Sequence, residues 1–294
     1  MRRSVCVNIK RFSLILLFCL TAFQVQARPK HLPDLTEQTL WPDALVQKAY
    51  GHIVQGGLLM FELAPDVSLT LDGRPVPKNE NWAVIGFDRD QETDAELVFE
   101  SAQRREIRKL TVLAKDYNIQ RIEGIPQKYV TPAPEALEKI RADGAKKREA
   151  RKDVSNLLGF LDGFSWPVLG PITGVFGSQR FYNGEPRRPH YGIDVAAPTN
   201  TPVKAAAPGR VTLASSDMYF EGGLVFIDHG LGLTSIYMHL NSVDVREGEM
   251  VRAEDVIGTV GATGRVTGPH LDWRLQWMGR NLDPSLLVPP MPDQ

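Results

Sequence analysis

Short runs of β-forming residues, each closed by a glycine or proline turn, fill most of the chain beyond residue 40. In the first half these runs are Leu58–Phe61, Val67–Leu71, Trp82–Phe87, Ala95–Phe99 and Ile107–Leu113. Turn signals such as Asp72 followed by Gly73 separate them. Strands this short and this regularly spaced predict a small β-sandwich over residues 40–130. The one histidine in this region, His52, is interpreted as structural.

The same pattern returns from Thr173 onward. The second set of runs is Val203–Ala206, Gly209–Ala214, Leu224–Asp228, Leu233–His239, Asp255–Gly261 and His270–Gln276. Helix signals are almost absent among them, and Pro167 and Gly170 mark a new start. We therefore expect a compact all-β domain at residues 166–290.

The segment between the two β-rich regions has a different composition. From Pro132 to Asp153, apolar residues lie among many charged ones, and Lys146, Lys147 and Arg148 are consecutive. This pattern predicts an amphipathic, solvent-exposed helix within a linker at residues 131–165, and a nucleic-acid-binding patch is the weaker interpretation. The expected fold class is all-β, with two β domains joined by a helical linker.

The N-terminal segment has the features of a secretory signal. Basic residues precede an apolar run from Phe12 to Phe23, and Val25 and Ala27 fit the small residues that signal peptidase needs. The run of about twelve residues is shorter than the roughly 20 that cross a bilayer as a helix. Residues 1–27 are therefore predicted to be a signal peptide, with an uncleaved anchor as the alternative. No transmembrane segment is expected after cleavage, and the mature protein is expected in the periplasm or outside the cell.

Cleavage would change the charge and the cysteine content. The 34 basic and 35 acidic residues give −1, and losing the four basic residues of the signal would leave −5. Both cysteines, Cys6 and Cys19, would also be lost. A mildly acidic protein is not expected to bind nucleic acid or a polyanionic membrane surface. Without disulfides, its stability must come from an apolar core or from a metal ion.

Four of the six histidines lie between residues 190 and 270, so we look for chemistry there. His190 and Asp194 are four residues apart with a glycine between them, which lets both reach one metal ion where a loop runs into a strand. His239 ends a β-run. His270 and Asp272 alternate along another run, so their side chains share a face.

In their order along the chain, these motifs resemble the LytM/lysostaphin-type metallopeptidases, which cut peptide bonds in bacterial cell walls. The matching stretches are His190–Asp194, Tyr237–Leu240 and Thr267–Leu271, flanked by Val175–Gly177, Ile227–Gly230 and Gly261–Gly264. The resemblance covers about residues 170–289. The β-rich first half resembles the immunoglobulin-like module that precedes this domain in some Gram-negative members.

The resemblance implies one bound zinc ion. His190 and Asp194 map to two of its ligands, and His239 and His270 map to residues that assist the chemistry. The third ligand of the family is a histidine at the position where this chain has Asp272. This chain therefore departs from the family at the centre of the site.

Aspartate can replace the histidine in reach, because a carboxylate oxygen lies as many bonds beyond Cβ as the imidazole Nδ1. The charge differs more. Two carboxylates, from Asp194 and Asp272, neutralise a divalent ion, whereas the family's ligand set leaves one positive charge, and a neutralised ion acidifies its bound water less. Arg274 lies on the same face of the run and could offset the extra charge, through a salt link to Asp272 or to a substrate carboxylate. We interpret Asp272 as the third metal ligand.

The sequence therefore predicts a zinc metalloendopeptidase that hydrolyses the peptide crosslinks of peptidoglycan, with the stem peptides as its partner. The alternative is a LytM-type protein without activity that regulates cell-wall amidases, and a plain wall-binding module is a third possibility. Retention of four of five site positions favours the enzyme. Tyr219 and Phe220 are either a groove wall or a loop tip, and Arg187 and Arg188 either steer an acidic peptide or form a solvated loop. His229 is interpreted as structural.

Overall fold

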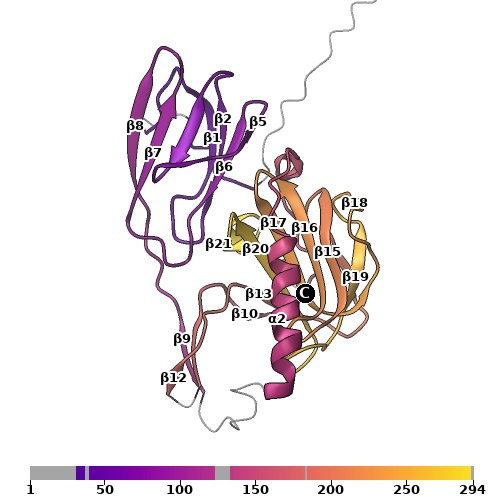
Figure 1. Cartoon of the computed structure of the whole chain (residues 1–294). Coiled ribbons are helices and arrows are strands. Elements are labelled where there is room, and N and C mark those ends of the chain that lie inside the picture. Colours follow the sequence, from indigo (N-terminus) through magenta and orange to yellow (C-terminus); the bar gives the residue numbers. More distant parts are fainter. Residues whose placement is uncertain (1–30, 37–39, 123–132, 183, 293–294) are drawn as a thin grey trace, which may run out of the picture.

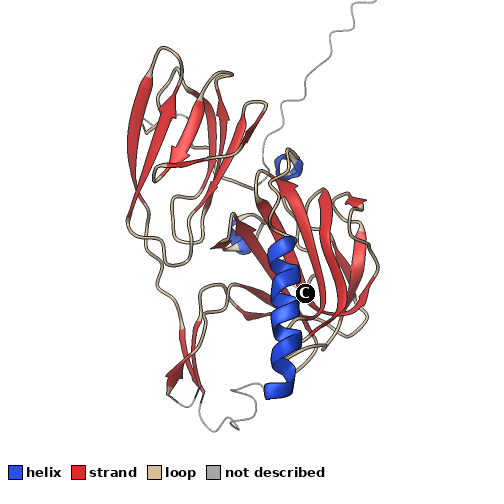
Figure 2. Cartoon of the chain, viewed as in Figure 1, coloured by secondary structure: helices blue, strands red, loops and turns tan. Residues whose placement is uncertain are grey.

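The computed structural model describes residues 31–36, 40–122, 133–182 and 184–292, and strands predominate among them (Figure 2). The predicted signal peptide lies outside the described residues. Within the described part of the chain, no helix is long and apolar enough to cross a membrane. The prediction of a mostly β protein with a helix between two β-rich regions is confirmed at this level.

Two antiparallel sheets form the first half. The first has the order β1-β2-β6-β5, from Val46–Gly51, Leu58–Leu63, Trp82–Gly86 and Lys78–Asn79. The second has the order β4-β3-β7-β8, from Arg74–Pro75, Ser68–Leu71, Asp94–Glu100 and Arg105–Thr111. Phe61 of β2 and Phe99 of β7 meet edge to face with their ring centroids 5.8 Å apart, so the two sheets share a core.

The turn between β3 and β4 shows how local sequence fixes this unit. Asp72 and Gly73 both have positive φ, 50° and 72°. A two-residue hairpin turn with both residues in this region is the one that an Asp-Gly pair favours, because its twist matches that of the flanking strands. The turn predicted from these two residues is confirmed.

A single large sheet forms the last part of the chain. Its main path is β10-β13-β20-β17-β16-β15-β18, from Ile172–Gly174, Gly192–Ala196, His270–Trp277, Leu233–Val243, Gly222–Gly230, Gly209–Met218 and Met250–Val251. Three further strands attach to it, namely β14 (Pro202–Lys204), β19 (Val256–Val260) and β21 (Arg280–Leu282). Short 3-10 helices lie at Pro134–Ala136, Gly159–Asp162 and Pro284–Leu286.

The middle of this sheet is covered on both faces. All nine residues of β16 are buried. Tyr237 and Trp273 lie in the main core, whereas Phe226 and Met238 belong to a smaller apolar cluster against which Ala150 packs. Strands buried on both faces have nearly continuous apolar sequences. This explains the continuous apolar run Leu224–Ile227 from which β16 was predicted.

Helix α2 (Leu137–Glu149) lies along the large sheet (Figure 1), and it is held there largely by polar contacts. Its buried Asp143 accepts a hydrogen bond from the Tyr219 backbone amide at 2.8 Å. Lys147 forms an ion pair with Glu221 in the turn between β15 and β16. The helix therefore fixes the turn that carries Tyr219, Phe220 and Glu221.

A third sheet joins the two halves, and no sequence pattern predicted it. Strand β9 (Ile119–Ile122) runs parallel to β11 (Gln179–Tyr182), which also pairs with β12 (Glu185–Pro186). Beside it, Arg89 donates to the carbonyl oxygen of Gly177 from Nε at 2.9 Å and from Nη2 at 2.7 Å. The first half thus stabilises the loop before His190 through hydrogen bonds from Arg89.

Candidate metal centre

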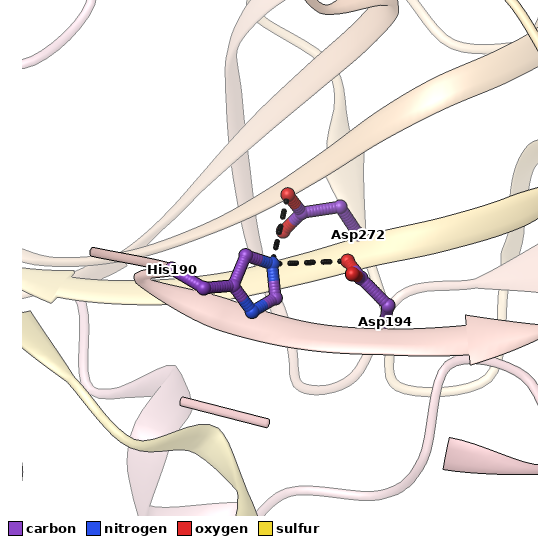
Figure 3. A group of neighbouring side chains, drawn as sticks. All are labelled: His190, Asp194 and Asp272. Carbon is purple, nitrogen blue, oxygen red and sulfur yellow. Dashed lines mark hydrogen bonds and ion pairs between the residues drawn. The ribbon is translucent and has the colours of Figure 1, made fainter. Parts of the chain in front are cut away.

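Adjacent strands bring the predicted metal ligands together. Asp194 on β13 and Asp272 on β20 are direct cross-strand partners in the antiparallel register. His190 lies just before β13, and its ring faces both carboxylates (Figure 3). All three residues are buried, and one ligand atom from each lies within 4.8 Å of the other two. The structure therefore assembles the three residues that the sequence predicted.

The contacts of His190 fix which of its ring nitrogens faces the carboxylates. Nδ1 lies 3.3 Å from the carbonyl oxygen of Val175, which can only accept a hydrogen bond, so this nitrogen carries the proton. Nε2 lies 3.0 Å from Asp194 Oδ1 and 3.4 Å from Asp272 Oδ2. When Nε2 carries no proton, its lone pair points to the place where a shared ion would lie. Outer hydrogen bonds of this kind orient metal-binding histidines.

A proton on His190 offsets part of the negative charge of Asp194 and Asp272. Burial opposes a charge on His190, but its contacts with Asp194 and Asp272 prevail and raise its pKa to about 9. Burial alone would raise the pKa of Asp272, yet Arg274 and His190 hold it well below its usual range. The centre attracts positive charge, which is the electrostatic condition for a divalent metal.

The residues fit a divalent ion such as zinc. One imidazole nitrogen and two carboxylate oxygens are ordinary zinc ligands. Asp194 Oδ1 is buried, and it lies 3.0 Å from His190 Nε2 and 3.8 Å from His270 Nε2. A Cβ on Gly174 would come within 2.2 Å of Asp194 Oδ2, so the backbone approaches this carboxylate closely. A buried carboxylate oxygen that lies this close to histidine ring nitrogens is suited to share a metal ion with them.

His239 and His270 lie beside this cluster with their ring centroids 5.0 Å apart. The Nδ1 atom of His239 is 3.0 Å from the carbonyl oxygen of Thr263, and that of His270 is 2.9 Å from the carbonyl oxygen of Gly268. Each Nδ1 is therefore protonated, which leaves Nε2 for chemistry. His270 Nε2 is 3.8 Å from Asp194 Oδ1. Burial lowers the pKa of His239, so this ring is neutral at pH 7.

The backbone of His239 adopts the left-handed region, with φ of 66°. Its amide donates to the carbonyl oxygen of Glu221 at 2.8 Å, and the pairing of β17 with β19 shifts register just beyond it. Irregular positions of this kind turn a side chain out of the strand pattern. This distortion lies at one of the two residues that the sequence predicted to assist the chemistry.

Arg274 binds Asp272, the residue predicted to be the third metal ligand. Its Nε donates to Asp272 Oδ1 at 2.9 Å and its Nη2 donates to Asp272 Oδ2 at 2.7 Å. Of the two contacts considered for Arg274 from the sequence, the structure forms the salt link to Asp272. One further basic residue near the centre was not predicted: Arg180 on β11 lies 3.8 Å from Asp194 Oδ2. No motif marks this position, because β11 reaches the centre only through its pairing with β9 and β12.

The remaining candidates lie around the centre or in the core. His229 is fully buried and both of its ring nitrogens have partners, which agrees with a structural role. Tyr219 and Phe220 pack edge to face, and the Arg265 guanidinium lies 4.5 Å from the Phe220 ring centroid. Phe220 therefore contacts the loop whose Thr263 carbonyl orients His239.

Comparison with known proteins agrees with the family resemblance seen in the sequence. Residues 188–284 match the model of peptidase family M23. A crystal structure described as an M23 peptidase from Pseudomonas aeruginosa superposes with a TM-score of 0.62 and 30% identity, covering 79% of this chain and 93% of that one. The chain belongs to peptidase family M23.

The M23 relatives with curated names are longer proteins. The DD-carboxypeptidase/endopeptidase Mpg of Neisseria meningitidis is 42% identical over 106 residues, which are 36% of this chain and 24% of that protein. The cell division protein DipM of Caulobacter vibrioides is 31% identical over 166 residues, which are 54% of this chain and 26% of that protein. This M23 chain therefore matches about a quarter of the length of each.

Proposed function

We propose that this M23 protein is a zinc-dependent endopeptidase that hydrolyses peptide crosslinks of bacterial peptidoglycan in the periplasm or outside the cell. One observation carries the proposal: His190, Asp194 and Asp272 converge, and the Nε2 atoms of His239 and His270 are left for chemistry beside them. The name of the Neisseria relative, a DD-carboxypeptidase/endopeptidase, supports the substrate class. The bond would then join D-amino acids of the stem peptides.

His190, Asp194 and Asp272 would hold one zinc ion. When bound, the ion would supply a Lewis acid for a scissile carbonyl and lower the pKa of a bound water. His239 is suited to accept a proton at Nε2, because burial keeps the ring neutral at pH 7 and the Thr263 carbonyl holds its orientation. His270 can return a proton or steady developing negative charge when its Nε2 is protonated.

The test is release of muropeptides from purified peptidoglycan, together with elemental analysis of the same protein. The wild type is expected to contain one zinc per chain and to release muropeptides, and a chelator is expected to abolish both. His190→Ala should lose both as well. Arg246→Gln changes an exposed arginine of the same domain and should retain both. A wild type that binds zinc but releases nothing would contradict the enzyme proposal.

The regulator of cell-wall amidases is the second candidate, and Asp272 is the observation that favours it. Its carboxylate is already held by Arg274, so the third ligand is less available than a free side chain. The relation to a protein named for cell division is compatible with this role. An inert protein that accelerates a purified wall amidase would decide for the regulator.

We further propose that the front unit is immunoglobulin-like and that a signal peptide is removed after Ala27. The orders β1-β2-β6-β5 and β4-β3-β7-β8 correspond to the A-B-E-D and C-F-G sheets of that fold, with one strand added beside C. An experimental structure of the front unit tests the first point. The intact mass of the exported protein tests the second.

A further inference from the structure

Asp272 and Arg274 form the most closely defined ion pair in the centre. Two parallel hydrogen bonds join the guanidinium to both carboxylate oxygens, at 2.9 and 2.7 Å. The side chain of Asp272 is 4% exposed, whereas that of Arg274 is 28% exposed. A bidentate pair of this kind fixes orientation as well as charge. The carboxylate cannot turn without breaking at least one of these bonds.

The neighbouring strand is built to admit this pair. Gly192 of β13 faces Arg274 of β20 in the antiparallel register. A Cβ at position 192 would come within 2.5 Å of both Arg274 Cγ and Asp272 Oδ1. Only a residue without a side chain leaves both groups where they are. The ion pair therefore occupies space that the backbone of the metal-binding segment leaves open.

The pair changes what Asp272 offers to a metal. A carboxylate has about four lone-pair sites, and Arg274 uses one on each oxygen. The remaining lone-pair site of Asp272 Oδ2 faces His190 Nε2, which lies 3.4 Å from this oxygen. The charge changes too, because a divalent ion with Asp194 and Asp272 is neutral, and the adjacent Arg274 brings the group to one positive charge. That is the net charge expected when a neutral imidazole takes the place of Asp272.

We propose that Arg274 is a positioning residue that makes Asp272 act as a charge-neutral ligand and lowers the affinity of the centre for divalent metal. This inference rests on the metal site of the proposed function. It separates two roles that Arg274 could have. If Arg274 is merely structural, its removal should weaken metal binding. If Arg274 competes with the metal for Asp272, its removal should strengthen metal binding.

The experiment measures the dissociation constant for Zn²⁺ by competition with a fluorescent chelator, using the full-length mature protein. Arg274→Gln should bind Zn²⁺ at least about tenfold more tightly, because the repulsion between a positive charge and a divalent ion a few ångströms apart exceeds this factor at an effective dielectric constant of about 20. Arg274→Lys keeps the charge but cannot form both parallel bonds, so its affinity should lie between the two. Arg246→Gln removes a distant exposed charge and should leave the affinity unchanged.

The outcomes distinguish this inference from the proposed function. Tighter binding by Arg274→Gln, including binding that appears only in the variant, supports the inference. Equal or weaker binding with zinc still bound by the wild type overturns the inference alone. Absence of binding in both proteins overturns the inference and the metal site together. If Arg274→Gln does not fold, Arg274→Lys decides, because an affinity no tighter than that of the wild type contradicts competition for Asp272.

Discussion

His229 differs from the histidines of the centre in what its second ring nitrogen contacts. In His190, His239 and His270, Nδ1 meets a backbone carbonyl, and in His190 and His270 Nε2 lies near the carboxylates of the centre. In His229, Nδ1 lies 2.7 Å from the Pro208 carbonyl oxygen and Nε2 lies 2.7 Å from Ser235 Oγ. A histidine with both nitrogens occupied inside the core has a structural role.

The burial of His229 predicts an acid-sensitive stability. Burial lowers its pKa from 6.5 to about 4, against weaker effects of the Pro208 carbonyl and Asp228. Between these values the unfolded chain binds a proton that the folded chain does not, so the free energy of unfolding falls as pH drops from 6.5 to 4. The loss is about 3 kcal/mol at about 1.4 kcal/mol per pH unit. Urea unfolding across this range should show it in the wild type, and His229→Asn should lose this part of the slope. Parallel slopes in the two proteins would contradict the assignment.

Restoring the histidine at position 272 gives a second prediction at this scale. Asp272→His alone leaves Arg274 beside an imidazole and a zinc ion, with two positive charges in the group. It is therefore expected to bind Zn²⁺ at least about tenfold more weakly than the wild type, since like charges lie a few ångströms apart. The double variant Asp272→His with Arg274→Gln removes the excess charge and should recover the affinity. The same chelator competition measures both, and a double variant no better than Asp272→His would point to steric misfit.

At the scale of strands, the candidate metal centre depends on the register in which β13 pairs with β20. Alternation along one run correctly placed His270 and Asp272 on a common face. The pairing of Asp194 with Asp272 could not be predicted in this way, because strands distant in sequence choose their register through the whole core. The same limit explains why β9 was missed: its four residues carry no alternation, and only β11 makes them a strand. The candidate metal ligands could be proposed from the sequence because three spaced motifs resemble a known family.

Gly192 provides the prediction at this scale. Gly192→Ala would place a methyl group within about 2.6 Å of Asp272, Arg274 and the Trp273 carbonyl. Overpacking of this kind costs about 1–3 kcal/mol in the free energy of unfolding, and displacement of Asp272 should weaken zinc binding. Gly268→Ala is the matched control, since a Cβ there meets nothing within 4 Å. Urea unfolding and zinc titration of both variants provide the test, and equal behaviour would show that the pair has room to move.

At the scale of the whole molecule, the two halves are joined close to the centre. Lys115 of the front half pairs with Asp283 at 2.7 Å, and Tyr117 packs edge to face on Phe176. Gly177 has no room for a side chain, because a Cβ there would come within 2.0 Å of the Tyr117 ring. The front half therefore acts on the loop that orients His190, although it holds none of the candidate site residues. The domain boundaries proposed from the sequence, at 130 and 166, remain predictions.

Arg89 gives a test of this coupling. Its two hydrogen bonds to the Gly177 carbonyl cross between the halves, and its guanidinium lies 4.4 Å from the Tyr117 ring centroid. Arg89→Ala should lower the free energy of unfolding by about 1.5–3 kcal/mol, the range for hydrogen bonds from a charged group, and should weaken zinc binding. Arg74→Ala, in the exposed β3–β4 hairpin, is the control and should change neither. Unchanged zinc affinity in Arg89→Ala would show that the front half does not influence the centre.

The pairing of β13 with β20 also sets when the centre can exist. His190 and Asp272 are 82 residues apart, and β20 comes after every other described strand of the large sheet except β21. During synthesis, a nascent chain can hold His190 and Asp194 while the strand that carries Asp272 has not yet been made. Contacts between residues so distant in sequence also form slowly. The candidate metal centre therefore cannot assemble until β20 has been made, and a nascent chain that ends before this strand lacks it.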